Sequence, residues 1–432
     1  MEQESPKDKI KKLLIELKKD NFIPQFCYNL NDKNNTIYYG GPLYGDEELV
    51  EAIHALLLGK WLVSGENVYK FERGFSKYIN LKHSLMVNSG SSANLVIIAT
   101  LKKHFNWKSD DEIITSVVGF PTTVNPIIQC NLTPVFCDIE LQTLNFDLFE
   151  VKKKITSKTK AIIVSPVLGN PPNMSELVSI CSKNNLLLIV DGCDSLGSKW
   201  ENKHLAEYGI MSSCSFYPAH HITTGEGGMI STNDQRLIDI ARSFAWWGRD
   251  CYCVGSANLL KNGTCGCRFS RWIPELNFDI DHKYIYTNIG YNLKPIDLQG
   301  IIGLVQLTRL EYIHLKRREY KNNIQKILSE IKGLSFPIKY SQADVSWFGV
   351  PIICESSYLK QKLVKYLEDN KIQTRNYFAG NLLLHSAYKY LDDWKLYPNA
   401  NTVLERIFFI GCSPTMTDKN IDYIKTVMSK YE

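Results

Sequence analysis

Two adjacent histidines stand before a glycine turn in residues 215–228, which read SFYPAHHITTGEGG. Imidazole titrates near neutral pH, so His220 or His221 can accept or donate a proton in a reaction. Neither residue carries an amine, so neither can hold a carbonyl compound as an imine in the way that a lysine can. The pair therefore indicates acid–base chemistry and not covalent attachment of a ligand.

Five further residues suit a flat, phosphorylated ligand. Gly90 and Ser91 lie in NSGSSAN, at a strand-to-helix junction whose free N–H groups can bind phosphate. Asp191 and Ser215 follow apolar strands, where a side chain can face a ligand. Phe120, in GFPTT, offers a face for stacking. Each residue also has an ordinary alternative role as a helix cap, a turn or a core residue.

Cysteines form the second chemical feature of the chain. Four of the twelve lie in CYCVGSANLLKNGTCGC, at positions 251, 253, 265 and 267, and Cys193 lies two residues after Asp191. Four thiolates can bind zinc or an iron–sulfur cluster, and no spacing rule separates the two here. The remaining cysteines stand singly, mostly in apolar stretches, and we expect buried thiols and no disulfides.

Strands and helices must bring these residues together. Short apolar runs predict strands at 112–115, 134–139, 161–166, 186–191, 212–217 and 227–232. Helical patterns, for example at 172–184, separate several of these strands. This alternation predicts an α/β fold with a mostly parallel sheet covered on both faces.

The 432 residues are too many for one ordinary core, and we expect a large domain and a smaller one. The expected parts are an N-terminal helical segment (1–40), a large cofactor-binding domain (41–300) with an irregular cysteine-rich loop (245–290), and a C-terminal α+β domain (301–432). Individual elements are expected as helices at 1–22 and 46–58, one long helix or two joined helices from 297, a strand at 345–354, and helices at 358–369 and after 418.

Composition is that of a soluble globular protein, with 44% hydrophobic and 22% charged residues and a formal net charge of +5. No stripe of lysine and arginine appears, so we expect no nucleic-acid partner. No run approaches the apolar length of a membrane span, and the first 20 residues do not resemble a signal peptide. We expect a cytoplasmic protein that does not contact the membrane.

In this order, the motifs resemble the nucleotide-sugar aminotransferase family of fold-type I pyridoxal-phosphate enzymes. The resemblance rests on the phosphate turn, the aromatic residue, D-x-x-D, the SF…TTGEGG loop and GYNLK at 290–294, and it covers nearly the whole chain. It implies that Asp191 pairs with the pyridine nitrogen and that Phe120 stacks on the ring. It also implies a phosphate site at Gly90, Ser91 and Ser215. Asn292 would reach in from the partner subunit of a homodimer.

Three departures from the family pattern point to a 3-dehydratase. His220 stands where the family has its lysine, so pyridoxamine phosphate should bind non-covalently and His220 should remove its C4′ proton. Asp194, near the ring oxygen, replaces a usual His or Gln, and Tyr217 replaces a usual His. We expect His221 to be structural. The implied substrate is a nucleotide-linked 4-keto-6-deoxy sugar that loses its 3-hydroxyl, in 3,6-dideoxysugar synthesis for a surface polysaccharide.

The cysteine stretches resemble an iron–sulfur branch of these dehydratases, which acts on a CDP-linked hexose. That resemblance implies a 2Fe–2S cluster on Cys193, Cys251, Cys253 and Cys265, with Cys267 as an alternative fourth ligand. It also implies an NADH-dependent flavin iron–sulfur reductase as electron donor. Two alternatives stay open, an iron-independent dehydratase recharged by glutamate and a non-catalytic, zinc-stabilised binding protein. The nucleotide (CDP, GDP or TDP) and the sugar also stay open.

Overall fold

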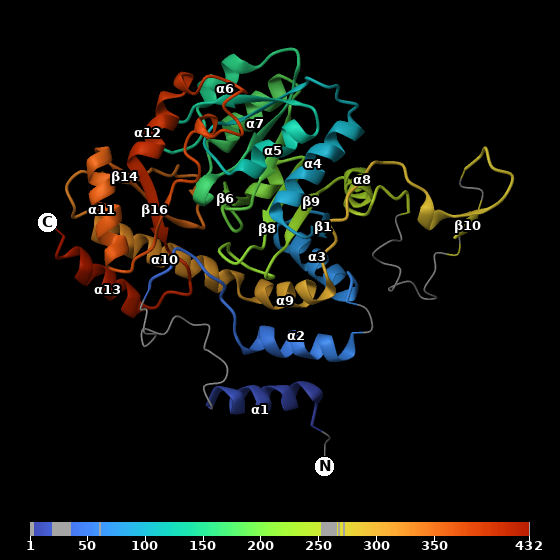
Figure 1. Ribbon diagram of the computed structural model, residues 1–432, viewed down its shortest axis with the longest axis horizontal. Coiled ribbons are helices and arrows are strands. Elements are labelled where there is room, and N and C mark those ends of the chain that lie inside the picture. Colours follow the sequence, from blue (N-terminus) through green and yellow to red (C-terminus); the bar gives the residue numbers. More distant parts are fainter. Residues whose placement is uncertain are drawn as a thin grey trace.

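The computed structural model describes residues 4–19, 36–59, 62–251, 266, 268–270 and 273–431. A seven-stranded sheet lies at its centre (Figure 1). In spatial order its strands are β1 (His83–Val87), β9 (Gly228–Thr232), β8 (Met211–Ser215), β5 (Leu187–Asp191), β4 (Thr159–Val164), β2 (Glu112–Ser116) and β3 (Thr133–Cys137). Only β9 runs antiparallel to its neighbours, which confirms the predicted α/β fold with a mostly parallel sheet.

Helices cover both faces of this sheet, as the continuous apolar strands predict. They are α3 (Glu66–Tyr78), α4 (Gly90–His104), α5 (Pro121–Gln129), α6 (Leu148–Lys154), α7 (Met174–Lys183) and α8 (Gln235–Ala245). Alternate residues of β4 belong to different core clusters. Ala161 and Ile163 share one cluster with residues of α4 and α8, and Ile162 and Val164 share another with residues of α6 and α7. These four consecutive side chains are therefore all buried.

A smaller antiparallel sheet occupies the C-terminal part, in the order β12 (Leu334–Ser335), β14 (Gly349–Cys354), β16 (Ile407–Gly411) and β15 (Thr374–Asn376). The helices of this part are α10 (Leu310–Leu328), α11 (Ser357–Asp369), α12 (Pro398–Arg406) and α13 (Asp418–Met428). Two joined helices, α9 (Asp297–Thr308) and α10, form from the pattern that begins at 297. The domain boundary predicted between residues 300 and 301 falls inside α9. The division into domains stays a prediction.

Smaller elements surround these two sheets. Two short strands, β6 (Lys199–Trp200) and β7 (Lys203–His204), form a three-stranded sheet with β13 (Ala343–Asp344). Within the described part of the predicted loop, β10 (Phe269–Ser270) and β11 (Ile280–Asp281) pair in an arm that projects from the body (Figure 1). Among the helices of the described residues, none is long and apolar enough to cross a membrane.

At the N-terminal end, helices stack in layers below the large sheet. Figure 1 shows α1 (Pro6–Lys19) lying on α2 (Asp46–Leu58), which in turn lies along α9. Ile10 and Leu14 of α1 are buried against Val50 of α2 in a small core cluster of their own. The amphipathic pattern of α1 therefore covers one face of α2 and does not reach the main core.

Candidate active site

A cavity of about 690 Å³ lies at the carboxyl ends of the parallel strands, between the two sheets. Residues of the C-terminal sheet contribute to its lining, among them Arg375 and Asn376 of β15 and Phe409 of β16. The cavity brings together nine residues singled out from the sequence, namely Gly90, Ser91, Phe120, Asp191, Cys193, Asp194, Ser215, Tyr217 and His220. Their chemical roles stay predictions at this point, but they do share one site.

The predicted phosphate-binding turn lies at the start of α4. Ser89 caps the helix by accepting a hydrogen bond from the N–H of Ser92. A Cβ atom on Gly90 would lie 2.7 Å from Cβ of Ser215 and 2.8 Å from Sγ of Cys193, so no side chain fits there. This close approach leaves the hydroxyls of Ser91 and Ser215 beside a helix N-terminus, an arrangement that suits an anion.

Four donors fix the carboxylate of Asp191, which is buried at the end of β5. Its Oδ2 accepts from Asn94 Nδ2 (2.8 Å) and from Thr123 Oγ1 (2.6 Å). Its Oδ1 accepts from Ser213 Oγ (3.2 Å) and from the N–H of Cys193 (3.3 Å). The carboxylate is thus held in one orientation and can accept a further, charge-assisted hydrogen bond from a ligand in the cavity.

His220 and Asp194 face each other, with 3.4 Å between Nδ1 and Oδ1. Burial lowers the pKa of His220 to about 4, and the positive charge of Arg317 acts in the same direction. Burial also raises the pKa of Asp194 to about 7, and the nearby Asp191 adds to that rise. Both shifts favour the neutral forms, so the imidazole is unprotonated near pH 7 and able to accept a proton.

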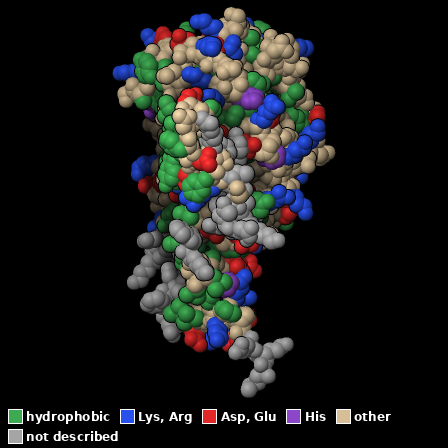
Figure 2. Space-filling view, turned by 90° about the vertical axis from the view of Figure 1, so that its right-hand side faces the viewer, with side chains coloured by type: hydrophobic (Ala, Val, Ile, Leu, Met, Phe, Trp, Pro, Cys, Tyr) green, Lys and Arg blue, Asp and Glu red, His purple; other side chains and the backbone are tan. Residues whose placement is uncertain are grey.

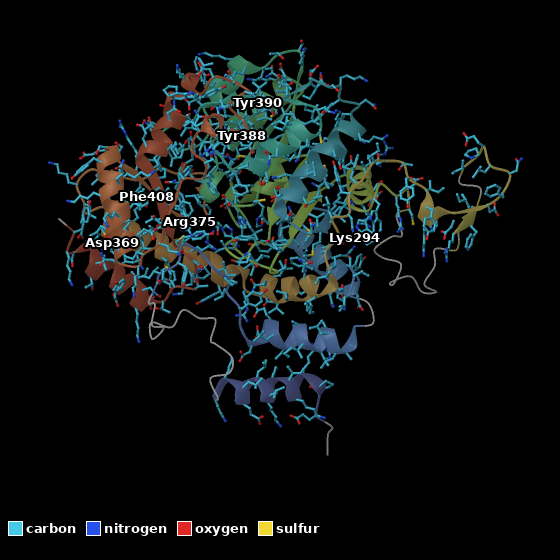
Figure 3. All side chains as sticks on the ribbon, viewed as in Figure 1. Lys294, Asp369, Arg375, Tyr388, Tyr390 and Phe408 are labelled. Atoms are coloured by element: carbon cyan, nitrogen blue, oxygen red, sulfur yellow. The ribbon has the colours of Figure 1, made fainter. Side chains whose placement is uncertain are left out.

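Aromatic side chains and one cation line the mouth of the cavity. Phe120 is 51% exposed, and its ring centroid lies 6.2 Å from that of Phe378 in an edge-to-face arrangement. Cζ of Arg375 lies 4.1 Å from the ring centre of Tyr39. Arg375, labelled in Figure 3 within the C-terminal part, is the only lysine or arginine lining the cavity among the described residues. The mouth therefore offers stacking faces and a positive charge.

Asn292 does not line this cavity. It is exposed, and its backbone pairs with Trp246 across from the end of α8. Two residues further on, Lys294 lies with Nζ 3.2 Å from the ring centre of Trp247, on the side of the molecule opposite to Arg375 in Figure 3. The role of Asn292 in the site of a partner subunit stays a prediction.

The structure describes two of the four predicted cluster ligands. Cys193 lines the cavity with Sγ 3.8 Å from Ser213 Oγ, and burial together with Asp191 raises the pKa of its thiol well above the usual range. Cys251 is buried, with Sγ 3.8 Å from Nε2 of His282. The other ligands, Cys253 and Cys265 and the alternative Cys267, lie outside the described residues. Within the described ranges no group of three or more His, Cys, Asp or Glu residues is placed to hold a metal ion.

Sequence reasoning missed three residues that shape the site. Asn94 and Thr123, which hold Asp191, lie inside the motifs NSGSSAN and GFPTT, so a search for partners within those motifs could have found them. Arg317 contacts the main chain of the loop that carries His220 and His221, here called the histidine loop. It has no local sequence signal because it stands in an ordinary helical pattern.

Comparison with known proteins shows the family of this chain. The model of the DegT/DnrJ/EryC1/StrS aminotransferase family matches residues 44–429. The lipopolysaccharide biosynthesis protein RfbH of Salmonella typhimurium is 40% identical over 91% of this chain and 90% of its own. The dTDP-4-dehydro-2,6-dideoxy-D-glucose 3-dehydratase of Saccharopolyspora spinosa is 35% identical over 90% of this chain and 85% of its own.

A solved structure is similar along nearly the whole length. It is a GDP-4-keto-6-deoxymannose-3-dehydratase with a trapped PLP–glutamate geminal diamine, 30% identical, with a TM-score of 0.79 over 91% of this chain and 100% of that one. The family match, the identity to curated relatives and this shared fold lead to one conclusion. The chain belongs to the DegT/DnrJ/EryC1/StrS aminotransferase family of fold-type I pyridoxal-phosphate enzymes.

Proposed function

We propose that this enzyme uses pyridoxamine phosphate to remove the 3-hydroxyl group from a nucleotide-linked 4-keto-6-deoxy sugar. The observation that carries the proposal is His220 in the cofactor cavity, together with the fact that no lysine lines that cavity among the described residues. An aminotransferase needs such a lysine to regenerate its cofactor in each turnover. A histidine can move a proton but cannot form that bond, and proton removal is what dehydration requires.

The residues of the cavity fit the cofactor. Ser91 and Ser215, beside the N-terminus of α4, would hold its phosphate, and the fixed carboxylate of Asp191 would accept a hydrogen bond from its ring nitrogen. Phe120 would stack on the ring. When bound, pyridoxamine phosphate supplies an amine that condenses with a keto group and a ring that accepts electrons.

His220 is the base in this proposal. Its pKa of about 4 keeps the imidazole neutral at physiological pH, ready to take the C4′ proton. The protonated imidazole can then pass a proton to the departing 3-hydroxyl, which leaves as water. Asp194, 3.4 Å away, is the acceptor that the protonated ring faces.

The mouth of the cavity and the relatives support the proposed substrate class. Arg375 supplies a cation at the mouth that suits the diphosphate of a nucleotide sugar. One relative acts on a dTDP-linked sugar and the structural neighbour on a GDP-linked one, so a nucleotide-linked deoxysugar is the shared class. The similarity to RfbH supports a product used in lipopolysaccharide.

For the reductive step we propose a 2Fe–2S cluster on Cys193, Cys251, Cys253 and Cys265, reduced by an NADH-dependent flavin iron–sulfur protein. Two facts support it: Cys193 lines the cofactor cavity, and four thiolates are the usual cluster ligands. A specific observation favours the alternative, a dehydratase recharged by glutamate, because the structural neighbour holds a trapped PLP–glutamate species.

A homodimer is also proposed, because exposed apolar side chains gather at the end of α2. Leu57 and Leu58 are 72% and 65% exposed, and the nearby Val63 and Ile296, 48% and 46% exposed, pair through their backbones. Figure 2 shows hydrophobic side chains among charged ones over the lower end of the molecule. A second copy would cover such a patch.

His220→Asn tests the dehydratase. The variant should keep pyridoxamine phosphate but lose substrate-dependent exchange of its C4′ proton with solvent by at least about a hundredfold, because its acid–base group is gone. His385→Asn, an exposed histidine outside the cavity, is the control. Exchange at the wild-type rate in His220→Asn would overturn the proposal.

Metal analysis of protein purified without air separates the two recharging routes. A 2Fe–2S protein should contain about two iron and two sulfide per chain. Cys251→Ser should lose both and stop reductive turnover, yet keep His220-dependent proton exchange. Cys181→Ser, a buried single cysteine of α7, is the control. Iron-free protein whose cofactor is regenerated by glutamate would refute the cluster and leave the dehydratase standing.

A further inference from the structure

The histidine loop is tied to the rest of the protein by a buried arginine. Arg317 of α10 is 1% exposed. Its Nη1 donates to the carbonyl oxygens of Trp347 (3.3 Å) and Phe348 (3.0 Å). Its Nη2 donates to those of Ala219 (3.5 Å) and His220 (3.2 Å). One guanidinium thus joins two loops that lie far apart in the sequence.

This cation has no carboxylate within 4 Å among the residues that the structure describes. A buried charge is costly unless it is well hydrogen-bonded, so its acceptors must be held in place. Four of them are main-chain carbonyls, which cannot swing away as side chains can. The thiol of Cys412 also hydrogen-bonds Arg317, and the charge of Asp194 acts on it from a longer distance. The flat fork of arginine suits two pairs of such acceptors, whereas the ammonium group of lysine is a point donor.

The same two loops make other contacts that keep them together. Nε2 of His221 lies 2.9 Å from the carbonyl oxygen of Ser346. The ring of Phe348 lies against His220, with 5.2 Å between ring centres. The N–H of His220 donates to the carbonyl of Tyr217 (2.9 Å), which makes a tight turn. The carbonyl of His220 therefore faces Arg317 while its imidazole faces the cavity.

We infer that Arg317 is a positioning residue, which holds the main chain at His220 so that the side chain of residue 220 keeps its place against the cofactor. The inference rests on the proposed function for its purpose, because a base that removes a proton from the cofactor must be held at a fixed place against it. Arg317 lies behind the loop and does not line the cavity, so it acts through His220 and touches no reacting atom.

A covalent capture experiment reads the position of residue 220 directly. In a His220→Lys background the introduced amine can capture pyridoxal phosphate, and borohydride makes the adduct permanent and measurable by mass. Adding Arg317→Lys should slow capture by about tenfold or more, since small misplacements of a reacting group are costly. Non-covalent binding of the cofactor, followed by its fluorescence, should change by less than about twofold, because the cofactor's anchors are untouched.

Arg318→Lys is the matched control, because the neighbouring arginine also bonds a main-chain carbonyl, that of Val345 (3.3 Å), and pairs with Asp344 (2.9 Å). It should leave capture unchanged. Capture by His220→Lys/Arg317→Lys at the rate of His220→Lys alone would overturn the inference.

A second measurement covers the case in which Arg317→Lys does not fold. Arg317→Ala, in the same His220→Lys background, is refolded with millimolar guanidinium or with equal ammonium. Capture restored by guanidinium alone supports the inference, and equal capture with both cations overturns it. Neither experiment needs the sugar. A wild-type protein without substrate-dependent proton exchange would therefore overturn the proposed function but leave this test in force.

Discussion

Replacing Asp191 by asparagine separates the chemistry of the site from its stability. The change keeps the shape of the side chain and removes its negative charge. In the proposed reaction the protonated ring nitrogen loses its anionic partner, so electrons from C4′ are accepted less well. We expect the exchange of the C4′ proton to fall by about a hundredfold or more, equivalent to about 2.7 kcal/mol in the barrier.

The cost in stability can be worked out from the four hydrogen bonds. The amide oxygen of the new side chain should take the place of Oδ2, where the two bonds are shorter, 2.6 Å and 2.8 Å. The amide NH₂ then faces Ser213, whose hydroxyl can turn to accept, and the N–H of Cys193, which cannot turn. One buried donor is left without a partner, which costs about 1–3 kcal/mol.

Asp138 offers a matched control at the end of β3. Its carboxylate is also buried and accepts from three backbone N–H groups, those of Ile139, Asn399 and Ala400. Asp138→Asn should lose a similar free energy of unfolding, about 1–3 kcal/mol, because one backbone donor is again left unpaired. It does not line the cavity, so proton exchange should stay near the wild-type rate.

Urea unfolding gives the free energy of each variant, and proton exchange at C4′ is followed by NMR in deuterated solvent with saturating cofactor and substrate. We expect the two variants to lose equal free energies of unfolding and Asp191→Asn alone to lose proton exchange. If Asp191→Asn and Asp138→Asn exchange equally fast, Asp191 is not the ring partner, and the assignment of this site fails.

Three further changes test other parts of the structure. Gly90→Ala should weaken cofactor binding by about tenfold or more in a fluorescence titration, because the new Cβ would lie 2.7 Å from Ser215 Cβ; unchanged binding would place the phosphate elsewhere. Burial raises the pKa of Glu72 from 4.5 to about 7, so the fold binds the proton more tightly than the unfolded chain and loses stability as pH rises between these values, by at most about 3 kcal/mol. Glu72→Gln should remove that slope in urea unfolding at pH 5 and pH 8, and a slope that persists would assign it to another group. Leu14→Ala should release α1, seen as faster proteolysis within residues 6–19, because its buried contacts are with α2 alone in the described chain; a matching fall in the main unfolding midpoint would show that α1 belongs to the central core.

Local patterns predicted much of the fold because the large sheet is buried on both faces. Of the strand predicted at 161–166, residues 161–164 form the second part of β4 (Thr159–Val164), and residues 165 and 166 lie beyond its end. The helix expected at 46–58 forms with those bounds. The sequence pattern after 297 did not decide between one helix and two. The break at Arg309 carries neither glycine nor proline and depends on packing. The strand expected at 345–354 begins at Gly349, because residues 345–348 cross to the histidine loop instead.

The order of the motifs predicted nine residues that line one cavity, but it did not predict the contacts that orient them. The donors of Asn94 and Thr123 reach Asp191 from elements 97 and 68 residues away in sequence. Arg317 stands 97 residues from His220 and looks like any exposed arginine in an amphipathic helix. Such contacts depend on how helices dock on the sheet, and spacing along a single sequence does not encode that docking.

A histidine at position 220, in place of the family's lysine, changes what the rest of the protein must hold in position. A lysine that bonds the cofactor fixes the cofactor and the base together. With His220 the two are held separately. Asp191 ends strand β5 and the turn at Gly90 begins α4, whereas the main chain at His220 is held from α10 by Arg317. Their separation then depends on how α10 packs. Substitutions in that contact should lower the rate of proton transfer while cofactor affinity is kept, which a covalently tethered site would not show.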